Sequence, residues 1–366
     1  MKKIVIFVGT RPEAIKMLPL YLELKKNNNK VFLCNTGQHG QMINQVLNFF
    51  KITPDFNLEV MKPAQSLTQL TSLIMNKASE LLKSIHPDLI LVHGDTATST
   101  AASLAAFFNK IDVAHIEAGL RTHNIYSPWP EEINRQINSR IAKYHFAPTE
   151  LSKLNLIKEN INPNSIFVVG NTVIDSLLYT LKELNEKKYE PIRSKYNSLK
   201  INNKIILVTG HRRENFDGGL ERICDAVKMI SKISNVHIIF PVHLNPDVQR
   251  TVYKNLKDIE NISLIEPLEY LEFVYCMSIS SLIISDSGGV QEEAPFLNVP
   301  VLVTREMTER PEVLDTKLVH IVGSEILKIY NYADQILKRN NTIKCSHFPF
   351  GKGDTSVKIA GLINEN

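Results

Sequence analysis

The chain alternates between short, continuously apolar segments and longer amphipathic stretches, and this rhythm constrains the fold more than any other feature. In the first half, helical patterns lie at about 12–27, 66–86, 97–109 and 131–142. The apolar segments around them begin at Lys3, Lys30, Asp88, Asp112, Tyr144 and Ile166. Apolar strands separated by helices are typical of a parallel sheet that is covered on both faces.

The rhythm restarts in the second half. A helical stretch follows Gly170, and a polar, Lys/Asn-rich segment runs from Arg193 to Lys204. New apolar segments begin at Lys204, Val236, Ile262, Ser281, Pro300 and Leu318. We therefore predict an α/β protein with two Rossmann-like domains facing a central cleft, where a ligand binds at the strand carboxyl ends. The expected domains are residues 1–170, joined by a C-terminal helix at about 350–366, and residues 171–349.

Composition excludes several classes of protein. The 366 residues suit two domains, and 43% hydrophobic with 22% charged residues is ordinary for a globular chain. A net charge of +4 does not favour nucleic-acid binding. The apolar start, Ile4 to Val8, is too short for a signal peptide, and no run is long and apolar enough to span a membrane. We expect a cytoplasmic protein.

The cysteines and the paired aromatic residues have simple interpretations. The four cysteines form no CxxC pair, so we expect neither a zinc site nor a disulfide framework; they are Cys34, Cys224, Cys276 and Cys345. The pairs Phe49–Phe50 and Phe107–Phe108 lie in helical patterns, and we expect them in the core.

Polar clusters follow the predicted strands, where open α/β sheets bind ligands. After the first strand, VGTRPEAIK places Arg11 and Lys16 near a helix N-terminus, which would stabilise a phosphate. A plain strand-to-helix turn with solvated charges is the alternative. After another strand, HGDTATST contains Asp95, which fits either a functional carboxylate or a helix N-cap.

A long loop and a dense polar cluster also follow strands. Glu117 ends one strand and starts a loop that reaches Glu131 and Glu132 at a helix start. This carboxylate pair either serves function or only complements the helix dipole. Later, TGHRREN places His211 and its arginine neighbours at a strand end. Such a cluster is costly in a cleft that holds no ligand.

The second half contains a candidate phosphate cradle. In SDSGGVQEE, Ser287, Gly288 and Gly289 offer backbone N–H groups at a helix N-terminus, and Glu292 or Glu293 is placed to accept hydrogen bonds from ribose. This arrangement indicates a nucleotide-sugar. After the next strand, TREMTERPE supplies Arg305 and Arg310, for which solvated charges are the alternative interpretation.

These motifs together resemble the non-hydrolysing UDP-N-acetylglucosamine 2-epimerase family. The match runs nearly end to end, through VGTRPEAIKMLP, TGQHGQM, VHGDTATS, HIEAGLRT, PEEINR, TGHRREN, HLNP, SDSGGVQEE, TERPE and PFGKGDTS. The resemblance implies a GT-B architecture, a homodimer, and interconversion of UDP-GlcNAc and UDP-ManNAc for cell-surface polysaccharide. One departure is Leu268 in EPLEYLEF, where the family often has Gln, while Phe273 remains beside the expected uracil.

The resemblance also implies a mechanism and a set of site residues. UDP leaves C1 while a base removes the C2 proton, and re-addition through 2-acetamidoglucal needs no redox cofactor and no metal. The implied catalytic residues are Asp95, Glu117, Glu131 and His211. The implied UDP-sugar ligands are Arg11, Lys16, Phe273, Ser287, Gly288, Gly289, Glu293 and Arg310. A second, activating UDP-GlcNAc would contact Gln38, His39, Gln41, Met42, Arg212, Arg213 and His243.

Two other functions remain open on the sequence alone. A GT-B glycosyltransferase would share the UDP-sugar cleft but would require an acceptor and would not need the set of carboxylates. A catalytically silent UDP-sugar sensor would keep the phosphate cradle but lose a carboxylate.

Overall fold

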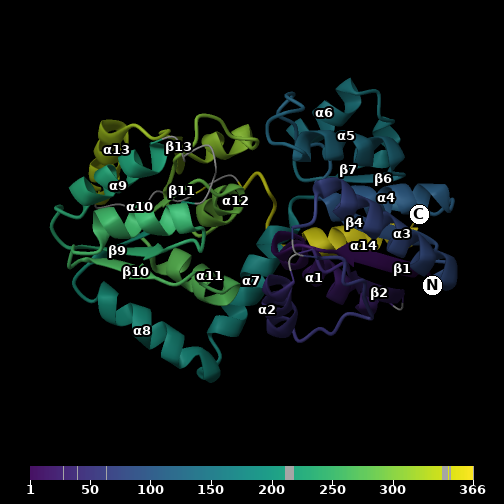
Figure 1. Cartoon of the computed structure of the whole chain (residues 1–366), viewed down its shortest axis with the longest axis horizontal. Coiled ribbons are helices and arrows are strands. Elements are labelled where there is room, and N and C mark those ends of the chain that lie inside the picture. The colour runs from purple at the N-terminus through teal and green to yellow at the C-terminus, as the bar shows by residue number, and fades with distance from the viewer. Residues whose placement is uncertain are drawn as a thin grey trace. The chain divides into compact units, whose positions relative to one another are not determined.

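The computed structural model of the chain consists of two compact units. It describes residues 1–27, 29–38, 40–62, 64–210, 218–339, 345 and 348–365, and of Gln41 only the backbone. One unit comprises Met1–Ser176 with Pro349–Asn366, and the other comprises Leu177–Phe348. Both are layered α/β structures (Figure 1). No helix among these described residues is long and apolar enough to cross a membrane.

The described part of the first unit is built on a seven-stranded parallel sheet with the order β3-β2-β1-β4-β5-β6-β7. Its strands are β1 (Lys3–Val8), β2 (Lys30–Asn35), β3 (Phe56–Asn57), β4 (Leu89–His93), β5 (Asp112–Ile116), β6 (Tyr144–Ala147) and β7 (Ile166–Val168). Its helices are α1 (Arg11–Lys26), α2 (Gln41–Phe49), α3 (Leu67–Ile85), α4 (Ala97–Phe108), α5 (Glu131–Ile141), α6 (Glu150–Lys158) and α14 (Thr355–Glu365). The helix α7 (Thr172–Leu184) leads from this unit into the next.

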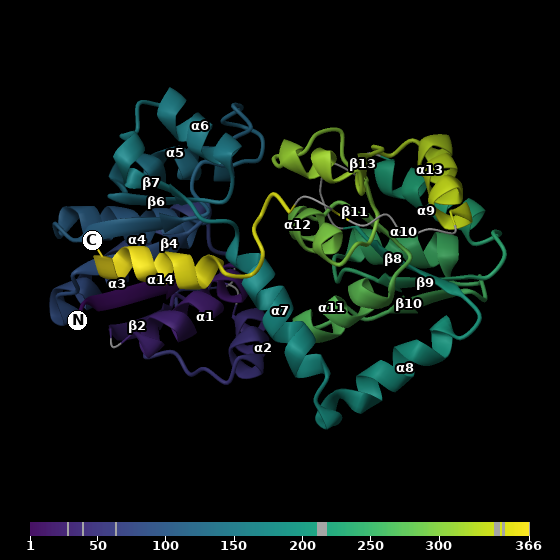
Figure 2. The same cartoon turned by 180° about the vertical axis from the view of Figure 1, so that it is seen from behind.

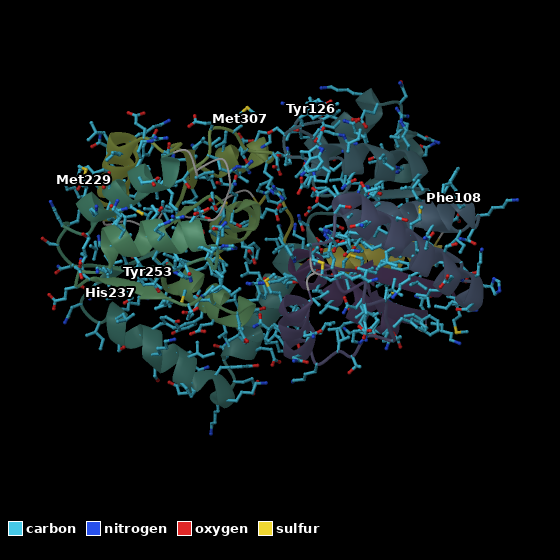
Figure 3. All side chains as sticks on the ribbon, in the orientation of Figure 1. Phe108, Tyr126, Met229, His237, Tyr253 and Met307 are labelled. Carbon is cyan, nitrogen blue, oxygen red and sulfur yellow. The ribbon has the colours of Figure 1, made fainter. Side chains whose placement is uncertain are left out.

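The strands are continuously apolar because helices cover both faces of the sheet. On one face, α3 and α4 pack against strand residues such as Val5 and Ile90. The buried side of α4 is made of alanines, including Ala101 and Ala105, and such small side chains allow close packing. The last two residues of α4 are exposed, contrary to our expectation. Phe107 and Phe108 are 59% and 66% exposed, so the prediction that they lie in the core is wrong (Figure 3).

The last helix belongs to the first unit. The yellow helix α14 lies beside α1 in Figure 1 and in Figure 2. The Lys2 ammonium donates to the Ile363 carbonyl at 2.6 Å, and the Thr355 hydroxyl donates to the Val169 carbonyl at 3.2 Å. A segment at the end of the chain thus completes a unit that begins with its first strand.

The described part of the second unit contains a six-stranded parallel sheet with the order β10-β9-β8-β11-β12-β13. Its strands are β8 (Lys204–Thr209), β9 (Val236–Pro241), β10 (Ile262–Ile265), β11 (Leu282–Ser285), β12 (Val301–Val303) and β13 (Val319–Ile321). Its helices are α8 (Glu190–Lys200), α9 (Gly219–Ile230), α10 (Pro246–Leu256), α11 (Tyr270–Ile279), α12 (Gly288–Phe296) and α13 (Ile326–Lys338). Helices α9, α10 and α13 share one apolar core with the sheet.

The two sheets have the same connectivity. In each, the first strand is central, the next two strands are added on one side of it, and the following strands are added on the other side. This is the Rossmann order, and the predicted α/β class with two Rossmann-like parallel sheets is confirmed. Much of the polar Lys/Asn-rich segment belongs to helix α8. Its buried residue, Tyr196, donates a hydrogen bond to Glu272 at 2.6 Å.

Candidate functional site

The first cluster of site residues lies at the carboxyl ends of β1, β4 and β5, which are neighbours in the sheet. Glu117 directly follows β5 in a left-handed backbone conformation, with φ of 63°, and its side chain is 7% exposed. The Lys16 ammonium forms an ion pair with its Oε2. The Asn171 side chain donates to the same oxygen at 2.7 Å, and His93 Nε2 lies 3.7 Å from it. Glu117 is therefore a buried carboxylate with a dense set of neighbours.

Lys16, which the family resemblance assigns to the UDP-sugar, forms a buried ion pair with Glu117. It lies on the buried side of α1, and its side chain is 8% exposed. An ammonium in such a position needs an opposite charge nearby, and Glu117 supplies it. Arg11 stands at the first position of the same helix and is half-buried. Of the two cations, Arg11 is the one at the helix N-terminus.

Asp95 follows β4 and is tied to helix α5. The Arg135 guanidinium contacts its Oδ2 at 2.6 Å, and the Asn134 side chain donates to its backbone carbonyl at 2.8 Å. Glu131, the first residue of α5, precedes Arg135 by four positions and so shares its face of the helix. The structure thus links the turn that carries Asp95 to the helix that begins with Glu131.

Glu132 has a structural role that separates it from Glu131. It is fully buried and accepts hydrogen bonds from the backbone N–H groups of Thr122, at 3.0 Å, and His123, at 3.2 Å. It also pairs with Arg135 at 3.1 Å. Burial alone would raise the pKa of Glu132, but the Thr122 hydrogen bond and the Arg135 charge outweigh it and hold the pKa below its ordinary value. This carboxylate shapes the loop after β5.

Glu13 is a buried carboxylate that our sequence interpretation did not select. Its Oε2 accepts from the backbone N–H groups of Gly9, at 3.0 Å, and Thr10, at 2.8 Å, while the Thr96 hydroxyl donates to its Oε1 at 2.6 Å. Burial raises the pKa of Glu13 to about 7. The Thr-x-x-Glu spacing of Thr10 and Glu13 is a capping box, and that signal was available in the sequence.

Only glycine fits at position 9, because the segments that carry Thr36 and Thr98 lie against the turn after β1. A Cβ atom on Gly9 would lie 2.1 Å from the Thr98 hydroxyl and 2.3 Å from the Thr36 hydroxyl. The two hydroxyls are hydrogen-bonded at 2.8 Å, and Thr98 donates to Gln38 Oε1 at 2.9 Å. Gln38 therefore lies beside the turn after β1.

The other residues expected at an activator site are spread over both units. Met42 is 49% exposed on α2. His243 is exposed in the turn after β9, where its Nδ1 accepts from the Asn245 N–H at 3.1 Å. The remaining predicted residues lie outside the described residues or, for Gln41, have no described side chain; they are His39, Gln41, Arg212 and Arg213. The predicted catalytic residue His211 also lies outside the described residues.

The second cluster surrounds the N-terminus of α12, directly after β11. Ser287 is the N-cap residue, and Gly288 and Gly289 form the first turn. Arg310 packs under this turn, because a Cβ atom on Gly288 would lie 2.8 Å from its Nη1. Arg310 pairs with Glu292 and, at 3.2 Å, with Glu309. A buried guanidinium thus lies beneath the backbone amides of a helix start.

The remaining residues of the second cluster come from α11 and α12. Glu293 is 5% exposed and accepts a hydrogen bond from the Tyr270 hydroxyl at 2.7 Å. Phe273, one turn further along α11, is half-buried. The structure therefore brings together Ser287, Gly288, Gly289 and Arg310, and ties Glu293 to the helix that carries Phe273.

Together these clusters define a class of protein. In each unit, polar residues gather where parallel strands end and helices begin, and helix N-termini with cationic side chains suit an anionic ligand such as a nucleotide. Within the described part of the chain, no three His, Cys, Asp or Glu side chains gather as metal ligands would. The fold and site define a two-unit Rossmann-type protein with helix N-termini suited to an anionic ligand.

Comparison with known proteins identifies the family. A family model described as UDP-N-acetylglucosamine 2-epimerase matches residues 22–364. A UDP-N-acetylglucosamine 2-epimerase of Yersinia pestis is 48% identical over 366 residues, covering 98% of this chain and 97% of that protein. The crystal structure of UDP-GlcNAc 2-epimerase from Neisseria meningitidis, bound to UDP-GlcNAc, is 45% identical with a TM-score of 0.94, covering 100% of both chains. The chain belongs to the UDP-N-acetylglucosamine 2-epimerase family.

An archaeal relative extends the comparison to a more distant structure. The UDP-GlcNAc 2-epimerase from Methanocaldococcus jannaschii, in complex with UDP-GlcNAc and UDP, is 35% identical with a TM-score of 0.87, again covering 100% of both chains. The resemblance noted in the sequence motifs is thus confirmed over the whole length of the chain.

Proposed function

We propose that this protein is a UDP-N-acetylglucosamine 2-epimerase, which interconverts UDP-GlcNAc and UDP-ManNAc and supplies ManNAc for cell-surface polysaccharide. The observation that carries this proposal is the cluster of acidic residues at neighbouring strand ends, Asp95 after β4 and Glu117 after β5, with Glu131 on the helix tied to Asp95. The end-to-end similarity to 2-epimerases supports it.

The chemistry explains why such a cluster is needed. C2 of the sugar has no adjacent carbonyl, so its proton is poorly acidic. A base takes that proton, a C1=C2 double bond forms, and the C1–O bond breaks as UDP leaves with the electron pair, which gives 2-acetamidoglucal. Re-addition of UDP at C1 with proton delivery to the opposite face of C2 completes the reaction. Acid and base groups are needed on both faces, and we assign the proton transfers to the carboxylates.

The other residues then receive distinct roles. We assign the leaving diphosphate to Arg11, to the amides of Ser287, Gly288 and Gly289 with Arg310 beneath them, and to His211. Phe273 would contact the uracil and Glu293 the ribose. Lys16 is assigned to the UDP-sugar as well, and its ion pair with Glu117 supports an additional role as the counter-ion of that carboxylate. No redox cofactor or metal has a part in this scheme.

Incubation with UDP-GlcNAc in D2O, followed by NMR, tests the proposal. We expect UDP-ManNAc to form without an acceptor, with deuterium at C2 of the sugars. A glycosyltransferase would need an acceptor and would leave C2 unlabelled. A silent sensor would bind UDP-GlcNAc and give no exchange. Either result would contradict the proposal.

Substitution of the three carboxylates tests their role. Asp95→Asn, Glu117→Gln and Glu131→Gln keep the side-chain shape but remove acid–base capacity, so each should lower turnover by about 10²-fold or more. UDP affinity, measured by calorimetry, should change little. The control is Glu80→Gln, which alters an exposed carboxylate on α3 and should leave both quantities unchanged. Wild-type turnover in any of the three variants would remove that residue from the mechanism.

We further propose that the protein acts as a homodimer in the cytoplasm. The exposed aromatic pair Phe107 and Phe108 on α4 supports a subunit contact, because large apolar side chains gain free energy when covered. All four cysteines are buried, and Cys34, Cys224 and Cys276 are free thiols, which suits a reducing compartment.

Regulation by the substrate is part of the same proposal. A second UDP-GlcNAc would contact Gln38, Met42 and His243, together with His39, Gln41, Arg212 and Arg213. Such a molecule would raise the activity by binding the active state of the protein more tightly than the inactive state.

A further inference from the structure

Asn171 joins three segments that are far apart in the sequence. Its side-chain amide donates to Glu117 Oε2 at 2.7 Å, and its Oδ1 accepts from the Val173 N–H at 3.1 Å. Its own backbone N–H donates to the Phe350 carbonyl at 2.8 Å. The residue is 3% exposed. Asn171 therefore connects the carboxylate after β5, the start of α7 and the segment that precedes α14.

The backbone around Asn171 is fixed by close contact with that last segment. Gly170 has a φ of 96°, and a Cβ atom there would lie 2.7 Å from the Thr355 hydroxyl and 2.8 Å from the Phe350 carbonyl. The Thr355 hydroxyl in turn donates to the Val169 carbonyl. The two segments are thus in close contact, with the Thr355 hydroxyl between them, and this contact supports the position of Asn171.

Three side chains of the first unit approach the same oxygen of Glu117. Lys16, Asn171 and His93 all approach Oε2. Oε1 lies towards Gly94, where a Cβ atom would be 3.6 Å away. An ion pair with Lys16 neutralises the charge but leaves the carboxylate able to turn about its last bond. A second donor on Oε2 stops that rotation and orients Oε1.

We propose that Asn171 is a positioning residue for Glu117, and that the segment at Phe350 holds Asn171 in place. This inference rests on the proposed function, in which the Glu117 carboxylate transfers a proton at C2. Asn171 fixes Oε2 and thereby directs Oε1 to the substrate, and it does not itself touch the reacting atoms.

The first test is Asn171→Ala, which removes the donor. We expect kcat to fall about 10-fold or more, because proton transfer depends on the orientation of the base. KM for UDP-GlcNAc and UDP affinity should stay within about two-fold of wild type. Deuterium incorporation at C2, measured at saturating substrate, should slow in proportion to kcat.

The second test is Asn171→Asp, which keeps the shape and the Oδ1 that accepts from Val173. It places a second carboxyl group beside Glu117 Oε2, and two carboxylates at this distance share a proton. The acidic limb of the pH profile of kcat should move upward by about one unit or more. Lys16 from α1 and His93 from β4 face the same carboxylate and are unchanged in the variant.

Asn155→Ala is the matched control. Asn155 on α6 is also buried, and its side chain donates to the Gly119 carbonyl at 3.0 Å, two residues beyond Glu117, without contacting the carboxylate. It should lower Tm to a similar extent as Asn171→Ala and leave the pH profile of kcat unmoved. A purely structural role for Asn171 would make the two alanine variants alike in kcat and would overturn the inference.

The outcomes separate this inference from the proposed function. If the wild-type protein exchanges C2 hydrogen but a folded Asn171→Ala variant keeps its kcat, the positioning role is wrong and the function stands. An unmoved acidic limb in Asn171→Asp also overturns the positioning role, even if the alanine variant does not fold. If the wild-type protein shows no exchange, the proposed function fails, and the inference fails with it.

Discussion

At the scale of single residues, Glu13 connects two turns of the first unit. It accepts hydrogen bonds from the turn after β1 and from Thr96, which caps α4 directly after Asp95. Its carboxyl group is 1% exposed, and burial raises its pKa to about 7. A carboxyl whose pKa is raised by folding stabilises the protein in its protonated form and loses that contribution when it ionises.

The stability of the protein should therefore respond to the titration of Glu13. The contribution of the protonated carboxyl is complete below its ordinary value near 4.5 and is lost as the pH rises through about 7. The glutamine in Glu13→Gln does not titrate. As the pH rises from about 4.5 to about 7, the free energy of unfolding of the variant should therefore increase relative to that of the wild type by about 3 kcal/mol, at 1.36 kcal/mol per pKa unit. Urea unfolding of both proteins from pH 5 to 8 measures the gain. Parallel pH dependences would contradict the raised pKa.

Sequence position predicted some site residues and not others. We selected Asp95 and Glu117 because each comes within two residues of the end of an apolar strand, and the strand ends of a parallel sheet meet at one edge. The partners of Glu117 were not found. Lys16 is 101 residues from it and Asn171 is 54 residues from it. Such contacts depend on how the elements pack, and no local pattern contains them.

At the scale of elements, helix α14 is held by a half-buried carboxylate on α7. Asp175 Oδ1 accepts a hydrogen bond from the Ser356 N–H at 2.8 Å, in the first turn of α14. The first backbone N–H groups of a helix have no acceptor within the helix, and the Asp175 carboxylate provides an acceptor for one of them. Asp175 is half-buried, and burial raises its pKa above the ordinary value.

Loss of this contact should loosen α14. Asp175→Ala should lower the free energy of unfolding by about 1–2 kcal/mol, the usual cost of a lost helix cap. Denaturant unfolding measures the change. Asp225→Ala is the control, because Asp225 forms an exposed pair with Lys228 away from any helix start, and it should change stability by less than about 0.5 kcal/mol. Equal effects of the two substitutions would show that Asp175 does not hold the helix.

The elements were predicted best where burial is complete. The buried strands β1, β4 and β8 are continuous apolar runs, and their predicted positions agree closely with the structure. Helix α8 was not assigned from the sequence because it is mostly exposed and Tyr196 is its buried residue, so its pattern is nearly all polar. The prediction for Phe107 and Phe108 is wrong for the opposite reason. Apolar side chains at a helix end predict burial, but in this chain both side chains are exposed.

At the scale of the whole molecule, the two sheets wind in the same order without any repeat detected in the sequence. The shared physical pattern is the alternation of buried strands and covering helices, and many different sequences satisfy it. Each unit therefore has its own sheet edge of the kind at which open α/β sheets bind ligands.

Substrate regulation should appear in the kinetics. The rate should depend sigmoidally on UDP-GlcNAc, and UDP-ManNAc alone should react poorly until a little UDP-GlcNAc is added. His243→Ala should flatten the sigmoid and leave UDP affinity nearly unchanged. His237→Ala, which alters a histidine on β9 that contacts Ser263, is the control and should keep the sigmoid (Figure 3). Hyperbolic kinetics with prompt reaction of pure UDP-ManNAc would exclude the activator site.

The return of the chain to the first unit has a consequence for biosynthesis. Residues 349–365 leave the ribosome only after every strand of the second unit has been made. Until then, the Asn171 N–H has no Phe350 carbonyl to meet, and α1 lacks the helix that covers it. Domains generally fold as units during synthesis, yet here the earlier unit must wait for the later one. Until residues 349–365 have been made, a chain that already has both sheets therefore lacks the contact that holds Asn171 beside Glu117.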